Sequence, residues 1–308
     1  MPKRKLLITG GSGYLGRHLT AKAVERFEVC ATYHRHAGRI RAGQPIPLDL
    51  TNREDVFRVI AGAKPHAVIH TAAINPGDGT DARMWSVNVE GSRSVAEASA
   101  SVGARLVHVS SDSVHDGRHA PYPDEVAPSP INGYGRSKAA AEAAVIEAYP
   151  GAAIVRTSLI YGLTESRTFL MVGDPSLDCP DLDGLDQMDR GTAGFVERIE
   201  AGEMLTLFDD VIRQPIWVDS LSKALLKLAT LDFAGTLNIA GRQVMSREEF
   251  GRKMLDRWNV DLRGLVRSGR AAELSDAIPL DLRLSVDKAE ALLHMVFPGV
   301  DDVINNVQ

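Results

Sequence analysis

A glycine-rich turn near the start of the chain constrains the fold more than any other feature. The apolar run LLI at residues 6–8 is typical of a β-strand, and TGGSGYLG at residues 9–16 follows it directly. Apolar residues at helical spacing come next, so the turn joins a strand to a helix. Glycines let the backbone approach a pyrophosphate there, and the helix N-terminus presents free N–H groups to the anion. The spacing G-x-x-G-x-x-G is one residue wider than the common dinucleotide fingerprint, and a turn without any ligand stays an alternative.

Apolar β-type runs alternate with helical patterns over the first 160 residues. Runs such as LVHV at residues 106–109 lack clean alternation, which is typical of strands covered on both faces. This pattern predicts an α/β fold with a Rossmann-like, doubly wound parallel sheet and right-handed crossovers. The expected strands are Lys5–Thr9, Glu28–Tyr33, Ile46–Leu48, Ala67–His70, Arg105–Ser110 and Ala153–Thr157. The expected helices lie near residues 14–26, 52–62, 81–102 and 131–149.

The chain has 308 residues, enough for one large core or for a domain with an added lobe. We expect an NADP(H)-binding Rossmann domain over residues 1–160. Residues 161–308 should form mostly a small C-terminal α/β lobe that binds substrate. A segment near 204–232 should return to pack on the first domain.

Two further elements are assigned to this lobe. The apolar run Ala234–Ala240 reads as a strand, and Arg247–Trp258 reads as a helix. Ser246 with Glu249 three residues later predicts a capping box at the start of that helix. The lobe should pack against the carboxyl edge of the sheet, where a cleft would hold the substrate.

Composition argues against several functional classes. Charged residues make up 24% of the chain, and the net charge of -5 with a pI near 6.0 provides no basic footprint for nucleic acid. No apolar stretch approaches about 18 residues, and the basic start is too short for a targeting signal, so we expect neither membrane insertion nor secretion. The cysteines are Cys30 and Cys179; Cys30 falls in an expected core strand, where a buried thiol is favoured over a disulfide. We therefore expect a cytoplasmic protein.

A second motif, YGRSK at residues 134–138, carries groups that can move a proton. A tyrosine has a solution pKa of about 10, and a lysine ammonium held nearby favours the phenolate and lowers that pKa. Tyr134 and Lys138 are four residues apart, so on one helix they share a face. Ser111 follows an expected strand at its carboxyl end, where its hydroxyl could hydrogen-bond a substrate oxygen. With the glycine turn, these residues predict carbonyl or alcohol redox chemistry on a nicotinamide cofactor.

The end of the second strand should select the cofactor. An NAD site places a carboxylate there, whereas the sequence ATYHRH at residues 31–36 has cationic neighbours only. This favours NADP(H), with NAD(H) and a merely solvated basic loop left as alternatives. Asp49 is placed to accept from the adenine amino group, and the small residues 71–73 leave room for the cofactor beside the backbone. The expected cofactor-binding residues are Gly10, Gly13, Tyr14, Leu15, Gly16, His34, Arg35, Asp49, Leu50, Thr71, Ala72, Ala73, Tyr134 and Lys138.

The order of motifs resembles the extended short-chain dehydrogenase/reductase family over nearly the whole chain. The motifs are TGGSGYLG, HTAA, VNVEG, VSSDSVHDG, PINGYGRSK and RTSLIYG. Within the family, SSDSVHDG followed by Pro-Tyr and a glutamate looks most like the dTDP-4-dehydrorhamnose reductases. The resemblance implies Ser111, Tyr134 and Lys138 as the active-site set, with Asn88 helping to position the lysine through water. Members are often dimers through the helices that carry the tyrosine, so a homodimer is one expected state.

The resemblance also places a sugar-nucleotide site in the C-terminal half. The segment VIRQPIWVD at residues 211–219 is similar to a stretch where an arginine meets the substrate diphosphate, which makes Arg213 a candidate. A surface arginine in a loop is the alternative interpretation. A second family arginine is replaced by Ile278, and Arg283 nearby could substitute for it. The expected substrate residues are Ser111, Asp112, Arg213 and Arg283.

Three segments depart from the family pattern. The loop at residues 74–80 and Leu159 differ from rhamnose-type reductases, and both should face the reacting sugar. Residues 173–190 are rich in aspartate but lack the glycine turn and closing glutamate of a calcium loop, so we expect a solvated lid and no metal. The aspartates of this segment are Asp174, Asp178, Asp181, Asp183, Asp186 and Asp189.

The resemblance and the motifs together predict an NADPH-dependent reductase of a nucleotide-linked 4-ketosugar. One alternative is a sugar-nucleotide epimerase or dehydratase that keeps NAD bound. Another is a non-catalytic regulatory subunit that retains the fold, since some relatives serve as partners of another enzyme. The joint presence of serine, tyrosine and lysine argues against this last alternative, and the altered substrate loops argue for it.

Overall fold

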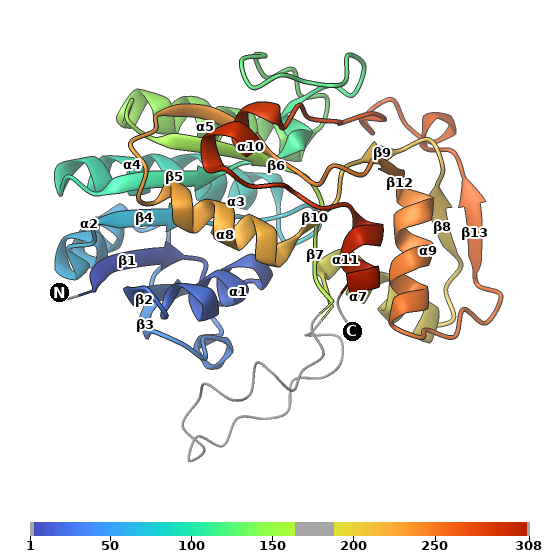
Figure 1. The fold of residues 1–308 in the computed structure, drawn as a ribbon, viewed down its shortest axis with the longest axis horizontal. Helices are drawn as coiled ribbons and strands as arrows, with labels where there is room; N and C mark the ends of the chain where they lie inside the picture. The colour runs from blue at the N-terminus through green and yellow to red at the C-terminus, as the bar shows by residue number, and fades with distance from the viewer. Residues whose placement is uncertain (1–2, 164–187, 307–308) are drawn as a thin grey trace.

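The computed structural model describes residues 3–163 and 188–306. Its centre is a seven-stranded sheet in the order β11-β6-β5-β4-β1-β2-β3 with all neighbours parallel (Figure 1). The strands are β1 Arg4–Thr9, β2 Phe27–Tyr33, β3 Gln44–Pro47, β4 Ala67–His70, β5 Arg105–Val109, β6 Ala153–Thr157 and β11 Gly235–Ile239. The strand order reverses between β1 and β4, the switch point at which such sheets bind ligands. The predicted doubly wound α/β fold is confirmed.

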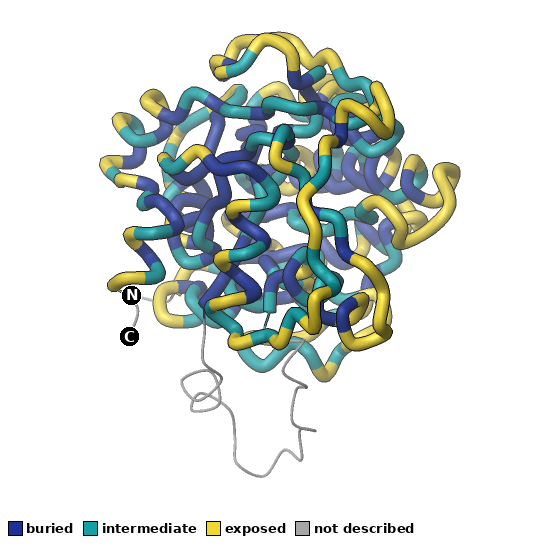
Figure 2. Tube along the Cα trace, turned by 90° about the vertical axis from the view of Figure 1, so that its right-hand side faces the viewer, coloured by how far each residue is buried: buried dark blue, intermediate teal, exposed yellow. Residues whose placement is uncertain are grey.

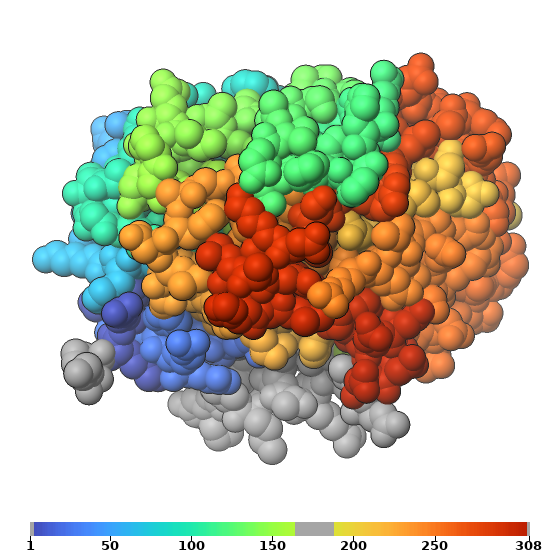
Figure 3. Space-filling view, turned by 45° about the horizontal axis from the view of Figure 1, so that its top comes forward, coloured from blue at the N-terminus to red at the C-terminus, as the bar shows by residue number. Residues whose placement is uncertain are grey.

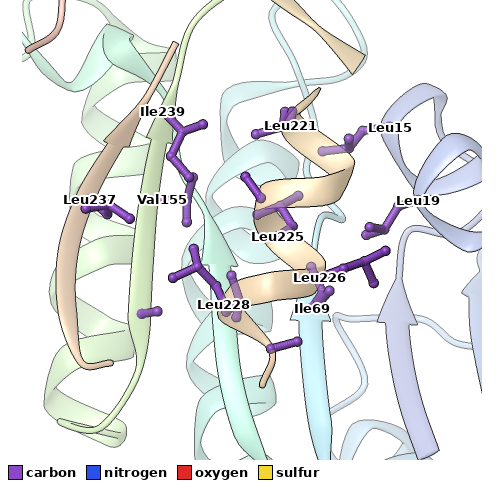
Figure 4. Packing of buried hydrophobic residues seen from close by; sticks show 14 of the residues in the cluster. Leu15, Leu19, Ile69, Val155, Leu221, Leu225, Leu226, Leu228, Leu237 and Ile239 are labelled. Carbon is purple, nitrogen blue, oxygen red and sulfur yellow. The ribbon is translucent and has the colours of Figure 1, made fainter. Parts of the chain in front are cut away.

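Both faces of the sheet are covered by helices because its strands are apolar on both sides. In β1, Leu6 and Ile8 belong to the core under α1 (Tyr14–Ala23), α8 (Val218–Leu228) and α10 (Asp287–Leu293). Leu7 belongs to the opposite core under α2 (Arg53–Ala63), α4 (Ser92–Ser101) and α5 (Gly133–Ala148). Figure 4 shows leucines of α1 and α8 meeting over the first face. In Figure 2 the buried residues follow the strands, and exposed residues gather in the outer loops.

The strand expected in the C-terminal lobe is instead part of the main sheet. The pairing of β11 with β6 is parallel and places Leu237 opposite Val155. Both side chains are fully buried in the core that contains α8. The chain therefore leaves α8 and returns to the sheet as its edge strand, and assignment to the lobe was wrong. The physical reason is that the apolar run has more surface to bury beside β6 than in a small lobe.

The rest of the C-terminal half contains short strand pairs and helices. A second core of Val196, Ile199, Leu205, Leu207 and Leu255 lies there, separate from the sheet. The predicted capping box is confirmed, because Ser246 and Glu249 bond each other's backbone N–H groups. The division into nucleotide-binding and substrate-binding parts stays a prediction. The elements are β7 Ile160–Tyr161, α7 Arg190–Glu200, β8 Leu205–Phe208, β9 Ile212–Arg213, β10 Ile216–Trp217, β12 Met245–Ser246, α9 Arg247–Arg257, β13 Val266–Gly269 and α11 Val300–Asn306.

The helix expected over residues 81–102 is interrupted. It begins as α3 (Asp81–Trp85), passes through a π-helical turn at Ser86–Gly91, and continues as α4. Such turns occur often at functional sites. Shorter 3-10 turns lie at Ala37–Arg39, Asp112–Val114 and Ala271–Glu273.

The C-terminal segment crosses back over the first half of the chain. In Figure 3 the red stretch with α10 lies against the green stretch around residue 125, where Lys288 Nζ donates to Glu125 at 2.8 Å.

Cys30 is buried with a free thiol, and Cys179 lies outside the described residues. Within residues 3–163 and 188–306, none of the helices has the length and apolar character needed to cross a membrane.

Candidate active site

The glycine turn forms an open cradle at the switch point. Gly10 has a φ of 71°, and a β-carbon on it would lie 2.8 Å from Ala72 Cα in the turn after β4. On Gly16 a β-carbon would lie 2.1 Å from the Gly10 carbonyl oxygen. Helix α1 starts after Gly13 with no side-chain cap and no acidic residue in its first turn, whereas Ser246 caps α9. The uncapped helix end fits a dinucleotide pyrophosphate.

The other predicted cofactor residues differ in what they offer. The side chains of Leu15 and Leu50 are buried in the two cores, which leaves only their backbone toward a ligand. Ala73 is partly buried beside Ala72, and Thr71 Oγ1 donates to the Thr9 carbonyl at 2.7 Å. The sequence-predicted residues of the turns after β1 and β4 therefore meet at one place.

The residues predicted to bind adenosine carry charged groups, and Tyr14 lies apart from them with its hydroxyl beside Gly162. His34 Nε2 lies 3.7 Å from Asp49 Oδ2, and Arg35 is exposed after β2. Bonds from the Thr51 backbone and side chain hold the pKa of Asp49 below its usual value. Tyr14 has a buried hydroxyl without a hydrogen-bond partner in the described part of the chain, and burial followed by the Asp189 charge raises its pKa.

Helix α5 brings the tyrosine and the lysine to the end of β5. Its first turn is capped by Asn132, whose Oδ1 accepts from Gly135 N at 2.8 Å. A β-carbon on Gly135 would lie 2.1 Å from the Ser113 carbonyl oxygen. Only glycine permits this approach, which carries Tyr134 to Ser111. The predicted common face of Tyr134 and Lys138 is confirmed by their places on α5.

Lys138 lies at the base of the site and is 3% exposed. Its Nζ donates to the carbonyl of Val109, the last residue of β5, at 2.8 Å. Burial lowers the pKa of Lys138 to about 8, and the Glu142 carboxylate one turn later opposes this shift. Glu142 in turn forms a buried ion pair with Arg156 of β6, with Oε2 2.8 Å from NH2.

Tyr134 lies in a buried environment that disfavours loss of its proton. Its pKa is raised to about 12, first by burial and then by the Asp112 charge, while a hydrogen bond with Ser111 and the Arg190 charge oppose the rise. The predicted lowering by Lys138 is not found, because that ammonium group is directed at the Val109 carbonyl. At neutral pH the tyrosine therefore carries its proton.

Asp112 is buried at the centre of the site. Its Oδ2 accepts from Ser158 Oγ at 2.8 Å, and its Oδ1 accepts from Ser111 Oγ at 3.2 Å. The Nε atom of Arg213 lies 3.9 Å from Oδ2. Burial raises the pKa of Asp112, and the guanidinium charge opposes this shift. Asp112 thus links the active-site serine to the arginines of the C-terminal half.

Asn88 lies in the π-helical turn and ties two segments together. Its side chain accepts from Ile74 N at 2.8 Å and donates to Ile74 O at 3.0 Å. It also donates to Ser137 Oγ at 3.1 Å. Asn88 therefore fixes the loop after β4 against the helix that carries Tyr134 and Lys138. The loop at residues 74–80 is one of those expected to face the sugar.

The two predicted phosphate-binding arginines are engaged with the protein itself. Arg213 is buried and donates to the carbonyls of Ile212, Leu280 and Pro279 at 2.7, 3.1 and 2.9 Å. Arg283 forms a two-pronged ion pair with Asp281, with NH2 2.7 Å from Oδ2. Both guanidinium groups therefore have protein acceptors in place of a phosphate.

Three charged residues near the site were missed by sequence reasoning or given another role. Asp189, counted with the acidic lid, is 3% exposed and caps α7 by accepting from Thr192 N at 3.0 Å. The other aspartates of that segment, residues 174–186, lie outside the described residues. Arg190 pairs with Asp78 of the loop after β4, and its charge acts on Tyr134. Arg247 is the first residue of α9, a position where the helix dipole disfavours a cation. Arg190 is likewise the first residue of α7, so the position alone does not distinguish Arg247.

Comparison with known proteins is consistent with this geometry. Residues 4–172 match the family model described as "RmlD substrate binding domain". The chain belongs to this family. It is also 32% identical over 269 residues to "dTDP-4-dehydrorhamnose reductase" of Mycobacterium tuberculosis (strain CDC 1551 / Oshkosh), covering 83% of this chain and 76% of that protein. The resemblance predicted from the sequence motifs is confirmed.

A second relative and a solved structure complete the comparison. The chain is 35% identical over 170 residues to "Methionine adenosyltransferase 2 subunit beta" of Rattus norvegicus, covering 54% of this chain and 49% of that protein. It thus spans about half the length of this relative. A crystal structure of dTDP-4-dehydrorhamnose reductase from Bacillus anthracis in complex with NADP has a TM-score of 0.76 and 26% identity, covering 99% of this chain and 97% of that one.

Proposed function

We propose that the protein is an NADPH-dependent reductase of a nucleotide-linked 4-ketosugar. The observation that carries this proposal is the convergence of Ser111, Tyr134 and Lys138 beside the glycine cradle, at the edge where parallel sheets bind ligands. The named activity of the M. tuberculosis relative and the NADP in the B. anthracis structure support it. We propose the class of nucleotide-linked 4-ketosugars and name no specific sugar, because the loop at residues 74–80 and Leu159 differ from the family pattern.

The cofactor site is proposed from the cradle. Gly10, Gly13 and the N-terminus of α1 would hold the pyrophosphate, and His34 with Arg35 would face a 2′-phosphate. The nicotinamide supplies hydride when bound. The absence of a carboxylate at the end of β2 favours NADPH over NADH, and a direct comparison of the two affinities would test this.

The residues of the chain then manage the proton. Tyr134 donates its phenolic proton to the substrate oxygen as the carbonyl carbon accepts hydride, which leaves a phenolate on the enzyme. The Arg190 charge, which opposes the raised pKa of Tyr134, stabilises that phenolate before a proton from solvent restores it. Lys138, an ammonium at neutral pH, would hold the nicotinamide ribose. Ser111 holds the carbonyl oxygen by a hydrogen bond. The raised pKa of Tyr134 favours this reductive direction, because the phenol is the resting form.

The test follows NADPH oxidation by the purified protein with dTDP-4-dehydrorhamnose as the probe substrate. We expect Tyr134→Phe to lower kcat by about 10²–10⁴-fold, the usual contribution of general acid catalysis, with NADPH affinity unchanged. Tyr149→Phe, at the far end of the same helix, is the matched control and should retain activity. Full activity of Tyr134→Phe would contradict the assignment.

A regulatory subunit is the second candidate function. Two observations favour it: the similarity to methionine adenosyltransferase 2 subunit beta and the altered segments at 74–80 and Leu159. In that case the protein would bind NADPH without oxidising it for any ketosugar, and Tyr134→Phe would change nothing. Co-purification with a catalytic methionine adenosyltransferase chain would then support the second function.

A further inference from the structure

Two arginines lie side by side where the C-terminal half meets the sheet. Strands β9 and β12 pair antiparallel, with Met245 opposite Arg213 (Figure 1). The backbone N–H of Arg247 then donates to the Val211 carbonyl at 2.8 Å, so α9 begins directly beside β9. This geometry brings the Arg247 guanidinium into the field of Arg213.

The two arginines differ in their partners. Arg213 donates to three backbone carbonyls. The guanidinium of Arg247 stacks over the Phe195 ring at 5.6 Å and has no side-chain hydrogen bond or ion pair with any residue in the described ranges. Burial and then the Arg213 charge lower the pKa of Arg247. A partly buried cation beside a second cation, with no acceptor of its own, is electrostatically unfavourable until an anion arrives.

Among the described residues, Asp112 Oδ2 lies 3.9 Å from Arg213 Nε, and no carboxylate forms an ion pair with Arg247. The charges of Asp112 and Asp189 act on Arg247, but Asp112 accepts from Ser111 and Ser158, and Asp189 caps α7. Asp112 contacts both Ser111 and Arg213, so one side chain links the serine to the arginine pair.

We propose that Arg247 binds the diphosphate of the nucleotide-linked substrate through its free N–H groups, while Arg213 contributes charge and holds the backbone. This inference rests on the proposed function. A guanidinium matches two phosphate oxygens at once and is the side chain best suited to this contact. Arg247 would thereby supply the phosphate contact that Ile278 cannot make. The guanidinium groups of Arg213 and Arg283 donate to protein acceptors instead.

Calorimetric titration of dTDP and of UDP into the NADPH-loaded protein tests the inference without requiring turnover. Arg247→Gln should weaken binding of the diphosphate that the wild type prefers by about 10- to 100-fold, the worth of a charge-assisted bond to phosphate. Arg252→Gln is the matched control one turn along α9, where Nε donates to Glu248 at 2.8 Å; it should bind as the wild type does. Arg247→Lys keeps the charge and should fall between the two.

The outcomes separate the two proposals. Equal diphosphate affinity of the wild type and Arg247→Gln would overturn the role of Arg247 and leave the reductase proposal standing. A wild type that binds neither diphosphate would overturn both. A drop in melting temperature or NADPH affinity in Arg247→Gln beyond that of Arg252→Gln would indicate a structural role and overturn the inference. If Arg247→Gln fails to fold, wild-type affinity in Arg247→Lys would overturn the two-pronged contact.

Discussion

The proposed catalytic edge of the sheet and the arginine pair of the C-terminal half differ in how far their polar side chains are bonded within the protein. At the catalytic edge, Lys138 and Asn88 are held by bonds within the protein. At the arginine pair, Arg213 is held in the same way, but within residues 3–163 and 188–306 the Arg247 guanidinium has only the Phe195 ring for a partner. Under the proposed function, the chain fixes the geometry of proton transfer before substrate arrives. It leaves the charge of Arg247 available for the substrate diphosphate.

The largest expected effect comes from removing the buried Glu142 charge that pairs α5 with β6. Glu142→Gln leaves the buried Arg156 guanidinium without its counter-charge, and we expect a loss of about 3–5 kcal/mol in the free energy of unfolding. Urea denaturation measures it. Glu147→Gln on the same helix disrupts the exposed pair with Arg93 and should cost at most about 1 kcal/mol. Equal losses in the two variants would show that the catalytic edge is not anchored this way.

A smaller change sharpens the geometric half of the comparison. Gly135→Ala forces α5 away from the Ser113 carbonyl, so Tyr134 shifts relative to Ser111. We expect kcat for NADPH oxidation to fall by about 10²-fold, the usual effect of misplacing a catalytic group by an ångström. In Gly133→Ala the nearest atom to the new β-carbon is Met84 Cε at 3.8 Å, so this control should retain activity. Similar rates in both variants would contradict the proposed positioning.

The pH profile of the reaction tests whether the Lys138 ammonium charge is required. Lys138, with a pKa of about 8, is an ammonium below that pH and becomes neutral above it. Tyr134, with a pKa of about 12, keeps its proton over the same range. We therefore expect kcat/KM for reduction to be flat below pH 8 and to fall about tenfold per pH unit above it. A rate that stays constant for about two pH units above that value would show that the lysine charge is not required.

The sequence predicted those parts of the fold that depend on local pattern. The strands from β1 to β6 were predicted to within two residues at either end. Except for the mostly exposed β3, they were marked by apolar runs because strands covered on both faces need apolar residues throughout. Gly10 and Gly16 marked the cradle because their backbone geometry excludes a side chain. The spacing of Tyr134 and Lys138 predicted their common face.

Contacts between distant segments could not be read in the same way. The side chain of Arg213 points to carbonyls of residues 279 and 280, a contact that no local pattern encodes. The apolar pattern of β11 is compatible with a strand in the lobe or in the main sheet. Its parallel pairing with β6 in the main sheet is visible only in the structure. The raised pKa of Tyr134 follows from burial and from the Asp112 charge, neither of which is visible in the spacing.

The most direct test of the central claim follows the hydride itself. When both C4 hydrogens of the nicotinamide of NADPH are deuterium, one deuterium should appear in the reduced sugar when the wild type acts on dTDP-4-dehydrorhamnose, as read by mass spectrometry of the product. We expect one deuterium per NADPH consumed in the wild type and in Tyr149→Phe, and none above background in Tyr134→Phe within the same time. Labelled product formed equally fast by Tyr134→Phe, or no labelled product from a wild type that binds NADPH and ketosugar, would contradict the account.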